Sequence, residues 1–267
     1  MKKNKLAIFI CAHKPIENEI PKGKEYIIVA QNDSIKDNEH EVIYLTKDKF
    51  TQKHWRCYGE GCAIRYLWKH PDILPDYVGI AHYRRFFTQI IGEEQYVPSS
   101  VNRCGAIIMN PFVHNTTIRY NNWTVQCADH FEEDALALRE VVKDVNPDFS
   151  LYYEAMLSDN KQYGCNMFIM KKEHFLEMCD ICFAILDEFD KRMKYTDNDA
   201  VYKEIMRRHR RQRILGGIEW QARLQGFYLE WLTDTYYRYK FNINKCLKYN
   251  LGIPNSDITY ENYTYYR

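Results

Sequence analysis

The sequence predicts an α/β fold with a mostly parallel central sheet flanked by helices and a helical C-terminal region. Short, continuous apolar runs, typical of strands buried on both faces, recur along the chain. Segments with helical spacing of apolar residues separate these runs, and this alternation favours a parallel sheet. The 267 residues are enough for one large core. We therefore expect a single domain over residues 1–240 and a tyrosine-rich, extended tail over residues 241–267.

The order of the expected elements follows from these patterns. Apolar runs predict strands at residues 6–11, 26–30, 41–45, 77–81, 105–109 and 167–170. Helical spacing predicts helices over residues 58–70, 129–145 and 173–194, the first two closed by Pro71 and Pro147. Gly216 and Gly217 interrupt a further helical segment, and the next helix starts at Ile218.

Composition excludes several classes of protein. A net charge of +1 argues against a nucleic-acid partner. Nine cysteines, an odd number, with no signal peptide indicate reduced thiols in the cytoplasm. Glycine-rich phosphate loops and the zinc-protease and serine-hydrolase motifs do not occur, which weighs against dinucleotide oxidoreductases, P-loop kinases and hydrolases. The Cys179/Cys182 pair has no second pair to complete a zinc site, so no metal is expected there.

Polar side chains follow three of the predicted strands. They are His13-Lys14, Gln31 to Asp33 and His82 to Arg85. Because ligands of open α/β sheets bind at the carboxyl ends of the strands, we expect these segments to form one rim.

The paired arginines at the end of one strand are the sharpest feature. Arg84 and Arg85 carry permanently charged guanidinium groups, which bind phosphate through paired hydrogen bonds. His82 adds a third donor, and together these residues favour a diphosphate ligand. A solvated turn or a structural salt bridge is the alternative. Neighbouring side chains on a strand point to opposite faces, so only one arginine meets the ligand if the strand continues through Arg85.

Other candidates are scattered along the chain. Glu60 is either a surface carboxylate or a ligand contact, and Asn166 either caps a turn or bonds a ligand hydroxyl. Glu219 follows the glycine pair and could act as a general base on a movable loop. The basic run at residues 207–213 favours a membrane-surface or pyrophosphate-lipid contact, with a solvated helix face as the alternative.

Several segments together resemble one family. The specific ones are DYVGIAHYRRFF at residues 76–87 and NMFIMKK at residues 166–172; weaker ones are residues 11–15, Glu60 with residues 67–70, and His130 with Asp134. The sequence is similar to the uncharacterised-domain family of bacterial capsular and exopolysaccharide gene clusters, whose members are regarded as glycosyltransferases. The resemblance spans roughly residues 5–232.

The resemblance implies a GT-A-like fold and a hexosyltransferase reaction. The implied donor is a nucleotide sugar, UDP-linked, with galactofuranose as a candidate sugar. The implied acceptor is a growing capsular polysaccharide, exopolysaccharide or O-antigen, free or lipid-linked. The enzyme is expected in the cytoplasm, with residues 207–213 as a peripheral contact at the inner face of the membrane.

The resemblance also implies roles for individual residues. Typical GT-A enzymes hold a divalent metal with an Asp-x-Asp motif at a strand end, where this chain has His82-Tyr83-Arg84. Metal-independent transfer without a cofactor is therefore expected, with cationic side chains stabilising the leaving diphosphate. The residues assigned to the diphosphate are His13, Lys14, His82, Tyr83, Arg84 and Arg85, and those assigned to the sugars are Glu60, His130 and Asn166.

One departure concerns the catalytic carboxylate. The family tends to have the pattern Gly-aromatic-x-x-Glu-Arg-Leu near this end of the sequence. When its last two residues are compared with Arg223-Leu224, Ala222 stands in place of the glutamate, and the nearest carboxylate is Glu219. The family's glutamate is then missing or displaced, with Glu219 as the expected base and Asp134 in reserve. A non-catalytic glycan- or nucleotide-binding protein of a polysaccharide assembly is the alternative function.

Overall fold

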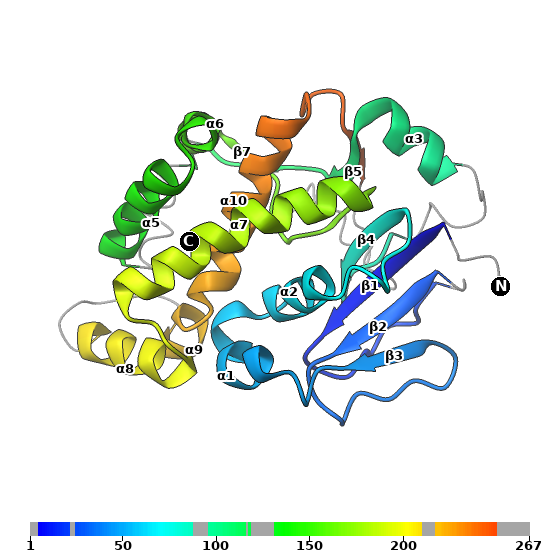
Figure 1. Cartoon of the computed structure of the whole chain (residues 1–267), viewed down its shortest axis with the longest axis horizontal. Helices are drawn as coiled ribbons and strands as arrows, with labels where there is room; N and C mark the ends of the chain where they lie inside the picture. The colour runs from blue at the N-terminus through cyan, green and yellow to red at the C-terminus, as the bar shows by residue number, and fades with distance from the viewer. Residues whose placement is uncertain are drawn as a thin grey trace.

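A seven-stranded sheet is the centre of the computed structural model (Figure 1). The structure describes residues 5–21, 25–87, 96–115, 117–118, 131–209 and 217–249. In spatial order the strands are β3 (Glu41–Tyr44), β2 (Tyr26–Ala30), β1 (Leu6–Ala12), β4 (Tyr77–His82), β8 (Phe168–Lys171), β5 (Ala106–Met109) and β9 (Leu247–Tyr249). The predicted fold class and the six predicted strands are confirmed, with no end shifted by more than one residue.

The direction of one strand decides where the polar ends meet. β1 runs parallel to β2 and β4, β2 to β3, and β5 to β9, whereas β8 runs antiparallel to both of its neighbours. Phe168 at the start of β8 pairs with Ile80 near the end of β4. The residues just before β8 therefore lie at the same edge as the carboxyl ends of β1, β2 and β4.

Both faces of the sheet are buried, which explains the continuous apolar runs. In β1, Ala7, Phe9 and Cys11 join one core cluster, while the alternate residues Ile8 and Ile10 join the other. Gly79 in β4 allows close packing at the centre of the sheet, because a Cβ there would lie 2.9 Å from Cγ1 of Ile8.

Helices cover the sheet and form a second layer beyond it. They are α1 (Lys49–Tyr58), α2 (Gly61–Lys69), α3 (Tyr96–Cys104), α5 (Glu132–Val145), α6 (Pro147–Ser158), α7 (Lys172–Met193), α8 (Asn198–His209), α9 (Gly217–Gln221) and α10 (Leu224–Lys240). Figure 1 shows α5, α6, α8 and α9 at one end of the molecule, with α7 and α10 running between them and the sheet. A small sheet of β6 (Phe112–Val113) and β7 (Lys161–Gln162) completes the described elements.

Some elements differ from the prediction. The helix expected over residues 58–70 is α2, and α1 precedes it in a segment whose only buried residues are Thr51, Cys57 and Tyr58. Pro147 closes α5 as expected but also begins α6, where proline is favoured because the first helical N–H needs no partner. Part of the expected tail belongs to the sheet, since residues 247–249 form β9 beside β5.

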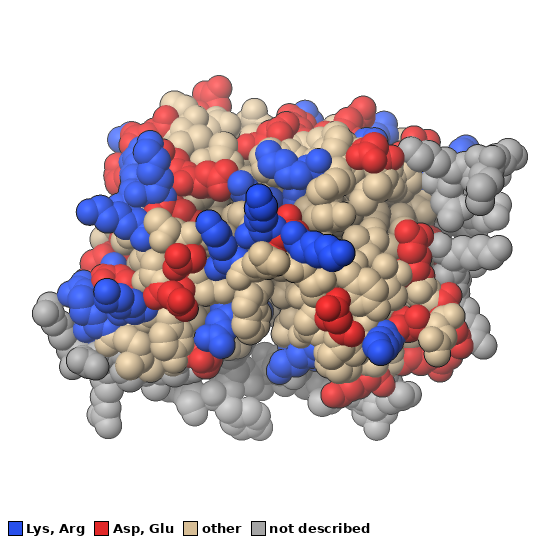
Figure 2. Space-filling view, turned by 60° about the horizontal axis from the view of Figure 1, so that its bottom comes forward, with Lys and Arg blue, Asp and Glu red and all other residues tan. Residues whose placement is uncertain are grey.

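The described surface carries both signs of charge. Figure 2 shows Lys and Arg side chains gathered near the middle of one face, with acidic side chains interspersed and a hollow below them. Among the described helices, none has the length and apolar character required to cross a membrane.

Candidate functional site

A buried carboxylate, Glu60, lies at the carboxyl rim of the sheet with three polar side chains around it. Asn166 Nδ2 donates a hydrogen bond of 3.1 Å to Glu60 Oε1. His82 Nε2 lies 3.9 Å from the same oxygen, and Arg223 Nη2 lies 3.8 Å from Oε2. We call Glu60, His82, Asn166 and Arg223 the Glu60 cluster. It brings together three residues that the sequence singled out separately, and adds Arg223.

The backbone on both sides of Glu60 fixes its position. Gly59 ends α1 with φ +52°, a conformation that glycine adopts without strain. Gly61 begins α2 in close contact with α10, because a Cβ there would lie 3.0 Å from Cδ2 of Leu229. The Glu60 side chain makes no capping hydrogen bond to α2, which leaves it directed at the cluster.

A tight turn over residues 82–85 directs the side chains of Arg84 and Arg85 to different places. The Arg85 N–H donates a 3.1 Å hydrogen bond to the His82 carbonyl, so His82 and Arg85 lie on one side of the turn. Arg85 Nη1 then reaches Cys165 Sγ at 2.9 Å, next to Asn166. Arg84 is exposed and lies over the Tyr83 ring, 5.0 Å from its centroid. Arg85 is thus the arginine placed against the cluster.

The turn before β8 joins the parts of the site. Cys165 and Asn166 have φ values of +67° and +47°, an uncommon backbone for non-glycine residues that often marks a functional site. His82 is hydrogen-bonded to the Cys165 backbone. The Cys165 N–H in turn binds the carboxylate of Glu230 on α10. Two consecutive left-handed residues therefore connect β4, β8 and α10 at the rim.

Several buried polar atoms here lack a partner among the described residues. They are His82 Nε2, Asn166 Oδ1 and Gln31 Oε1. Buried polar atoms in proteins are nearly always hydrogen-bonded, so the unpaired atoms of His82 and Asn166 beside the Glu60 carboxylate indicate a place for a polar ligand.

Electrostatics at the rim keep its histidines neutral. Burial lowers the pKa of His82, the Glu60 carboxylate opposes this shift, and the Arg85 guanidinium reinforces it. Burial, followed by the positive charge of Arg223, lowers the pKa of His13 to about 4. The His13 ring also meets Tyr83 edge-on, with centroids 4.7 Å apart. The predicted convergence of His13 and His82 is therefore present in the structure, while Lys14 is exposed.

Glu230 is the site residue that the sequence reasoning missed. Burial raises its pKa to about 7, and the charge of Glu60 adds to the rise. Residues 226–232 read Gly-Phe-Tyr-Leu-Glu-Trp-Leu, which is the family pattern with Trp231 in place of the arginine. The prediction that this glutamate is missing or displaced was wrong, because the pattern was compared at Arg223 rather than at Gly226.

The expected base, Glu219, lies outside the cluster. It is an exposed residue of α9 and forms no hydrogen bond or ion pair within the described ranges. His130, assigned to a sugar, falls outside the described residues.

Asp134, the reserve base, is part of an ion pair on another part of the molecule. It is 1% exposed at the start of α5 and accepts hydrogen bonds from Arg208 Nη1 at 2.9 Å and from Tyr195 Oη at 3.1 Å. Burial raises its pKa, and Arg208 opposes the rise. Arg208 also pairs with Glu204, as does Arg207. Two arginines of the basic run are thus engaged within the protein, and residues 210–213 lie outside the described ranges.

An Asp134→Asn variant is expected to lose stability and keep its activity. The variant weakens the hydrogen bonds from Arg208 and Tyr195 to a charged acceptor and leaves Arg208 with Glu204 alone, which lowers the free energy of unfolding by about 2 kcal/mol. Chemical denaturation measures this loss, and Asp144→Asn, at the exposed partner of Arg192, is the control with an expected loss below about 1 kcal/mol. A large fall in kcat per folded Asp134→Asn molecule would instead support a catalytic role.

The fold and the rim define the class as an α/β protein of GT-A-like architecture. A similar solved structure is that of WbbM, a bifunctional glycosyltransferase, in its apo form, with a TM-score of 0.63 and 20% sequence identity. The match covers 93% of this chain and 45% of that chain, so this chain spans less than half of that protein.

The chain belongs to the DUF4422 family, a domain of unknown function, whose model matches residues 7–241. None of the curated proteins matches it. The resemblance seen in the sequence is confirmed at the level of an uncharacterised family with a glycosyltransferase-like fold.

Proposed function

We propose that the chain is a glycosyltransferase that moves a hexosyl group from a nucleotide sugar to a saccharide acceptor. The observation that carries this proposal is the Glu60 cluster with Glu230 beside it, at the rim of a GT-A-like sheet. A uridine diphosphate sugar is the proposed donor, with galactofuranose among the candidate sugars. A growing bacterial surface polysaccharide, free or lipid-linked, is the proposed acceptor.

Cations on the donor side support a diphosphate leaving group. Arg85 and Arg223 approach the cluster from opposite elements, the turn after β4 and the start of α10. Guanidinium groups stay charged at all working pH values and bind phosphate through two parallel hydrogen bonds. They can stabilise the negative charge that develops on the diphosphate as the bond to the sugar breaks. Neutral His82 donates from its other ring nitrogen to the Cys165 backbone, so its unpaired Nε2 can accept a hydrogen bond from a ligand hydroxyl group rather than donate to the diphosphate.

The acceptor side needs a group that removes a proton. Glu230, with a pKa of about 7, is ionised in about half of the molecules at neutral pH and takes a proton readily from an approaching hydroxyl group. Attack from the face of the sugar opposite the diphosphate would invert the anomeric centre. We assign Asn166 and Glu60 to sugar hydroxyls, and their mutual hydrogen bond at the rim, beside Glu230, supports this assignment.

We further propose that transfer proceeds without a divalent metal. GT-A enzymes that use a metal carry paired aspartates where this chain has His82-Tyr83-Arg84. The positive charges of Arg85 and Arg223 fit the electrostatic role of the ion. Chelation with EDTA should leave the rate unchanged. Loss of activity that Mn²⁺ restores would contradict metal independence but not the glycosyltransferase function.

The experiment that tests the function is a nucleotide-release assay. Sugar nucleotides are first screened by thermal shift, and those that stabilise the protein are assayed with lipid-linked and free oligosaccharide acceptors. Acceptor-dependent release of UDP with formation of a lengthened glycan would establish the activity. Stabilisation by sugar nucleotides with no turnover on any acceptor would favour the non-catalytic binding protein.

An exposed tryptophan next to the cluster is expected to contribute to acceptor binding. Trp220 is 42% exposed, packs against Phe227 with ring centroids 5.0 Å apart, and lies over Arg223. Because a contact with an aromatic face contributes about 1 kcal/mol, Trp220→Ala should raise the acceptor KM about fivefold. Any change in the donor KM should be smaller, since Trp220 touches the donor side only through Arg223. Tyr152→Ala, at an exposed aromatic on α6, is the control. Equal KM values for Trp220→Ala and wild type would remove this residue from the acceptor site.

A further inference from the structure

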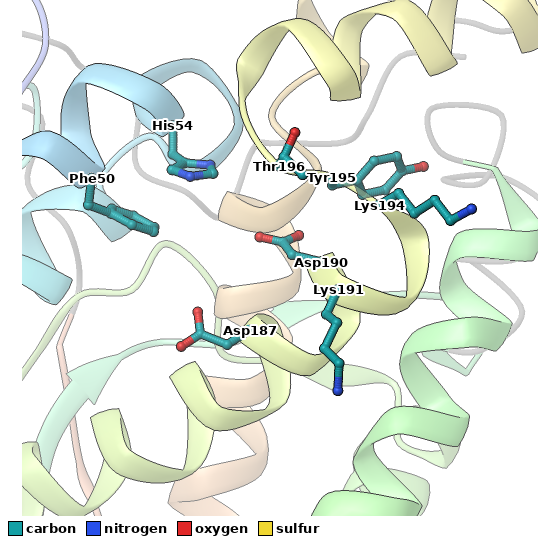
Figure 3. Close-up of a pocket in the computed structure, with 8 residues that line it drawn as sticks. All are labelled: Phe50, His54, Asp187, Asp190, Lys191, Lys194, Tyr195 and Thr196. Atoms are coloured by element: carbon teal, nitrogen blue, oxygen red, sulfur yellow. The ribbon is translucent and has the colours of Figure 1, made fainter.

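A second recess lies between α1 and the junction of α7 with α8. Its cavity volume is about 430 Å³, within the range of roughly 300–1,000 Å³ that small-ligand pockets occupy. Figure 3 shows the side chains around it. The lining residues are Phe50, His54, Asp187, Asp190, Lys191, Lys194, Tyr195 and Thr196.

One wall of this pocket is aromatic and fixed in place. The His54 ring stacks on Phe50 with centroids 4.4 Å apart, and the Arg65 guanidinium covers Phe50 at 4.3 Å. Arg65 is held in turn by Asp187 at 2.8 Å. Burial, with help from the charge of Arg65, lowers the pKa of His54, so its ring is neutral at neutral pH. The buried Nδ1 of His54 has no hydrogen-bond partner among the described residues.

The remaining lining groups are polar, and most of their charges are compensated. Asp187 pairs with Arg65 and Lys191 with Glu188, while burial raises the pKa of Asp190 to about 7. Lys194 is exposed, and Thr196 contributes a hydroxyl at the exposed side. The His54 ring, held on Phe50, with hydrogen-bond donors and acceptors around it, is complementary to a neutral sugar, which has apolar C–H faces and a rim of hydroxyls.

The pocket is connected to the Glu60 cluster through one carboxylate. Asp190 accepts hydrogen bonds from Tyr58 Oη at 2.8 Å and from Gln225 Nε2 at 2.7 Å. Tyr58 precedes Gly59 and Glu60, while Gln225 lies between Arg223 and Glu230. The pocket and the cluster thus share their supporting elements, α1 and α10.

We propose that this pocket is a saccharide site that holds a neutral sugar unit of the acceptor, away from its reacting end. Saccharide binding at the pocket stands on the geometry alone, whereas its role toward the acceptor rests on the proposed function. Such a site would favour longer acceptors, because a second contact on the same molecule adds affinity without altering the reacting groups.

Ligand-observed NMR with the neutral disaccharides lactose and maltose tests the binding. Thr196→Trp fills the pocket from an exposed position. Made in the Trp220→Ala background, which removes the proposed acceptor tryptophan, it should abolish saturation transfer, and His54→Ala should weaken it. Ser158→Trp, at an exposed position on α6, is the matched control and should bind like wild type. Glu230→Gln and Trp220→Ala should retain the signal. A signal that survives Thr196→Trp but is lost in Trp220→Ala would overturn the proposal, as would binding of inorganic phosphate in place of either sugar.

A kinetic measurement separates this proposal from the proposed function. With an active donor–acceptor pair, Thr196→Trp should raise the KM of a long acceptor and leave that of a monosaccharide acceptor unchanged. Equal KM values for long acceptors in the variant and wild type would refute the acceptor role. Absence of turnover with all acceptors would refute the enzyme, and the NMR result on the pocket would still stand.

Discussion

Glu230→Gln is expected to lower kcat by roughly 10²–10⁴-fold, the usual contribution of a general base, while the protein stays folded. The amide has the same shape and can still accept the hydrogen bond from the Cys165 N–H, but it cannot take a proton from an acceptor hydroxyl. Glu219→Gln is the matched control, since Glu219 is exposed on α9. A large loss of activity in Glu219→Gln with none in Glu230→Gln would reverse the assignment of the base.

The pKa of Glu230 gives this prediction two pH signatures. The wild-type rate should rise as pH increases through about 7, because only the ionised carboxylate is a base. Folding raises this pKa from 4.5 to about 7, so the folded state holds the Glu230 proton more tightly than the unfolded chain. The resulting contribution to the free energy of unfolding is complete below pH 4.5 and is lost as pH rises through about 7. Glu230→Gln should therefore unfold at a higher temperature than wild type above pH 7, by about 2–4 °C for each kcal/mol gained.

Arg85→Ala is expected to lower kcat by about 10²-fold, whereas Arg84→Ala should leave it unchanged. Loss of one preorganised donor to developing negative charge has an effect of this order. Arg84 serves as the internal control because it is adjacent in sequence but lies over Tyr83 on the surface. Arg85→Lys should recover only part of the rate, since lysine keeps the charge but not the fork of donors. A greater loss from Arg84→Ala than from Arg85→Ala would place the diphosphate on the other side of the turn.

Much of the architecture could be predicted because the strands are buried on both faces. A strand such as β1, with Phe9 in one core and Ile10 in the other, must be apolar throughout, and this pattern is visible in a single sequence. Helix α1 was not visible because most of its surface faces solvent. The antiparallel direction of β8 could not be predicted from its composition. This direction places Asn166, just before β8, within hydrogen-bonding distance of Glu60.

The individual site residues were predicted less evenly. Glu60, His82 and Asn166 were selected for separate reasons, and only the folded chain shows them in contact. Asp134, which resembles the family together with His130, was the reserve base. A carboxylate in the first turn of a helix can also have a structural role, and here Asp134 pairs with Arg208. Glu230 was missed because the family pattern was compared at Arg223 and Leu224, although a carboxylate among apolar residues of a mostly buried helix is itself unusual.

β9 follows β5 by many residues in the sequence, and this separation affects the order of folding during synthesis. β5 pairs with β8 on one side and with residues 247–249 on the other, so its second edge stays open until residues 247–249 have left the ribosome. An uncovered strand edge can pair with other chains and aggregate. Nascent chains that stop before β9 would leave the backbone of Ile107 and Ile108 unpaired at that edge, so synthesis of β9 is the step that protects the sheet from pairing with other chains.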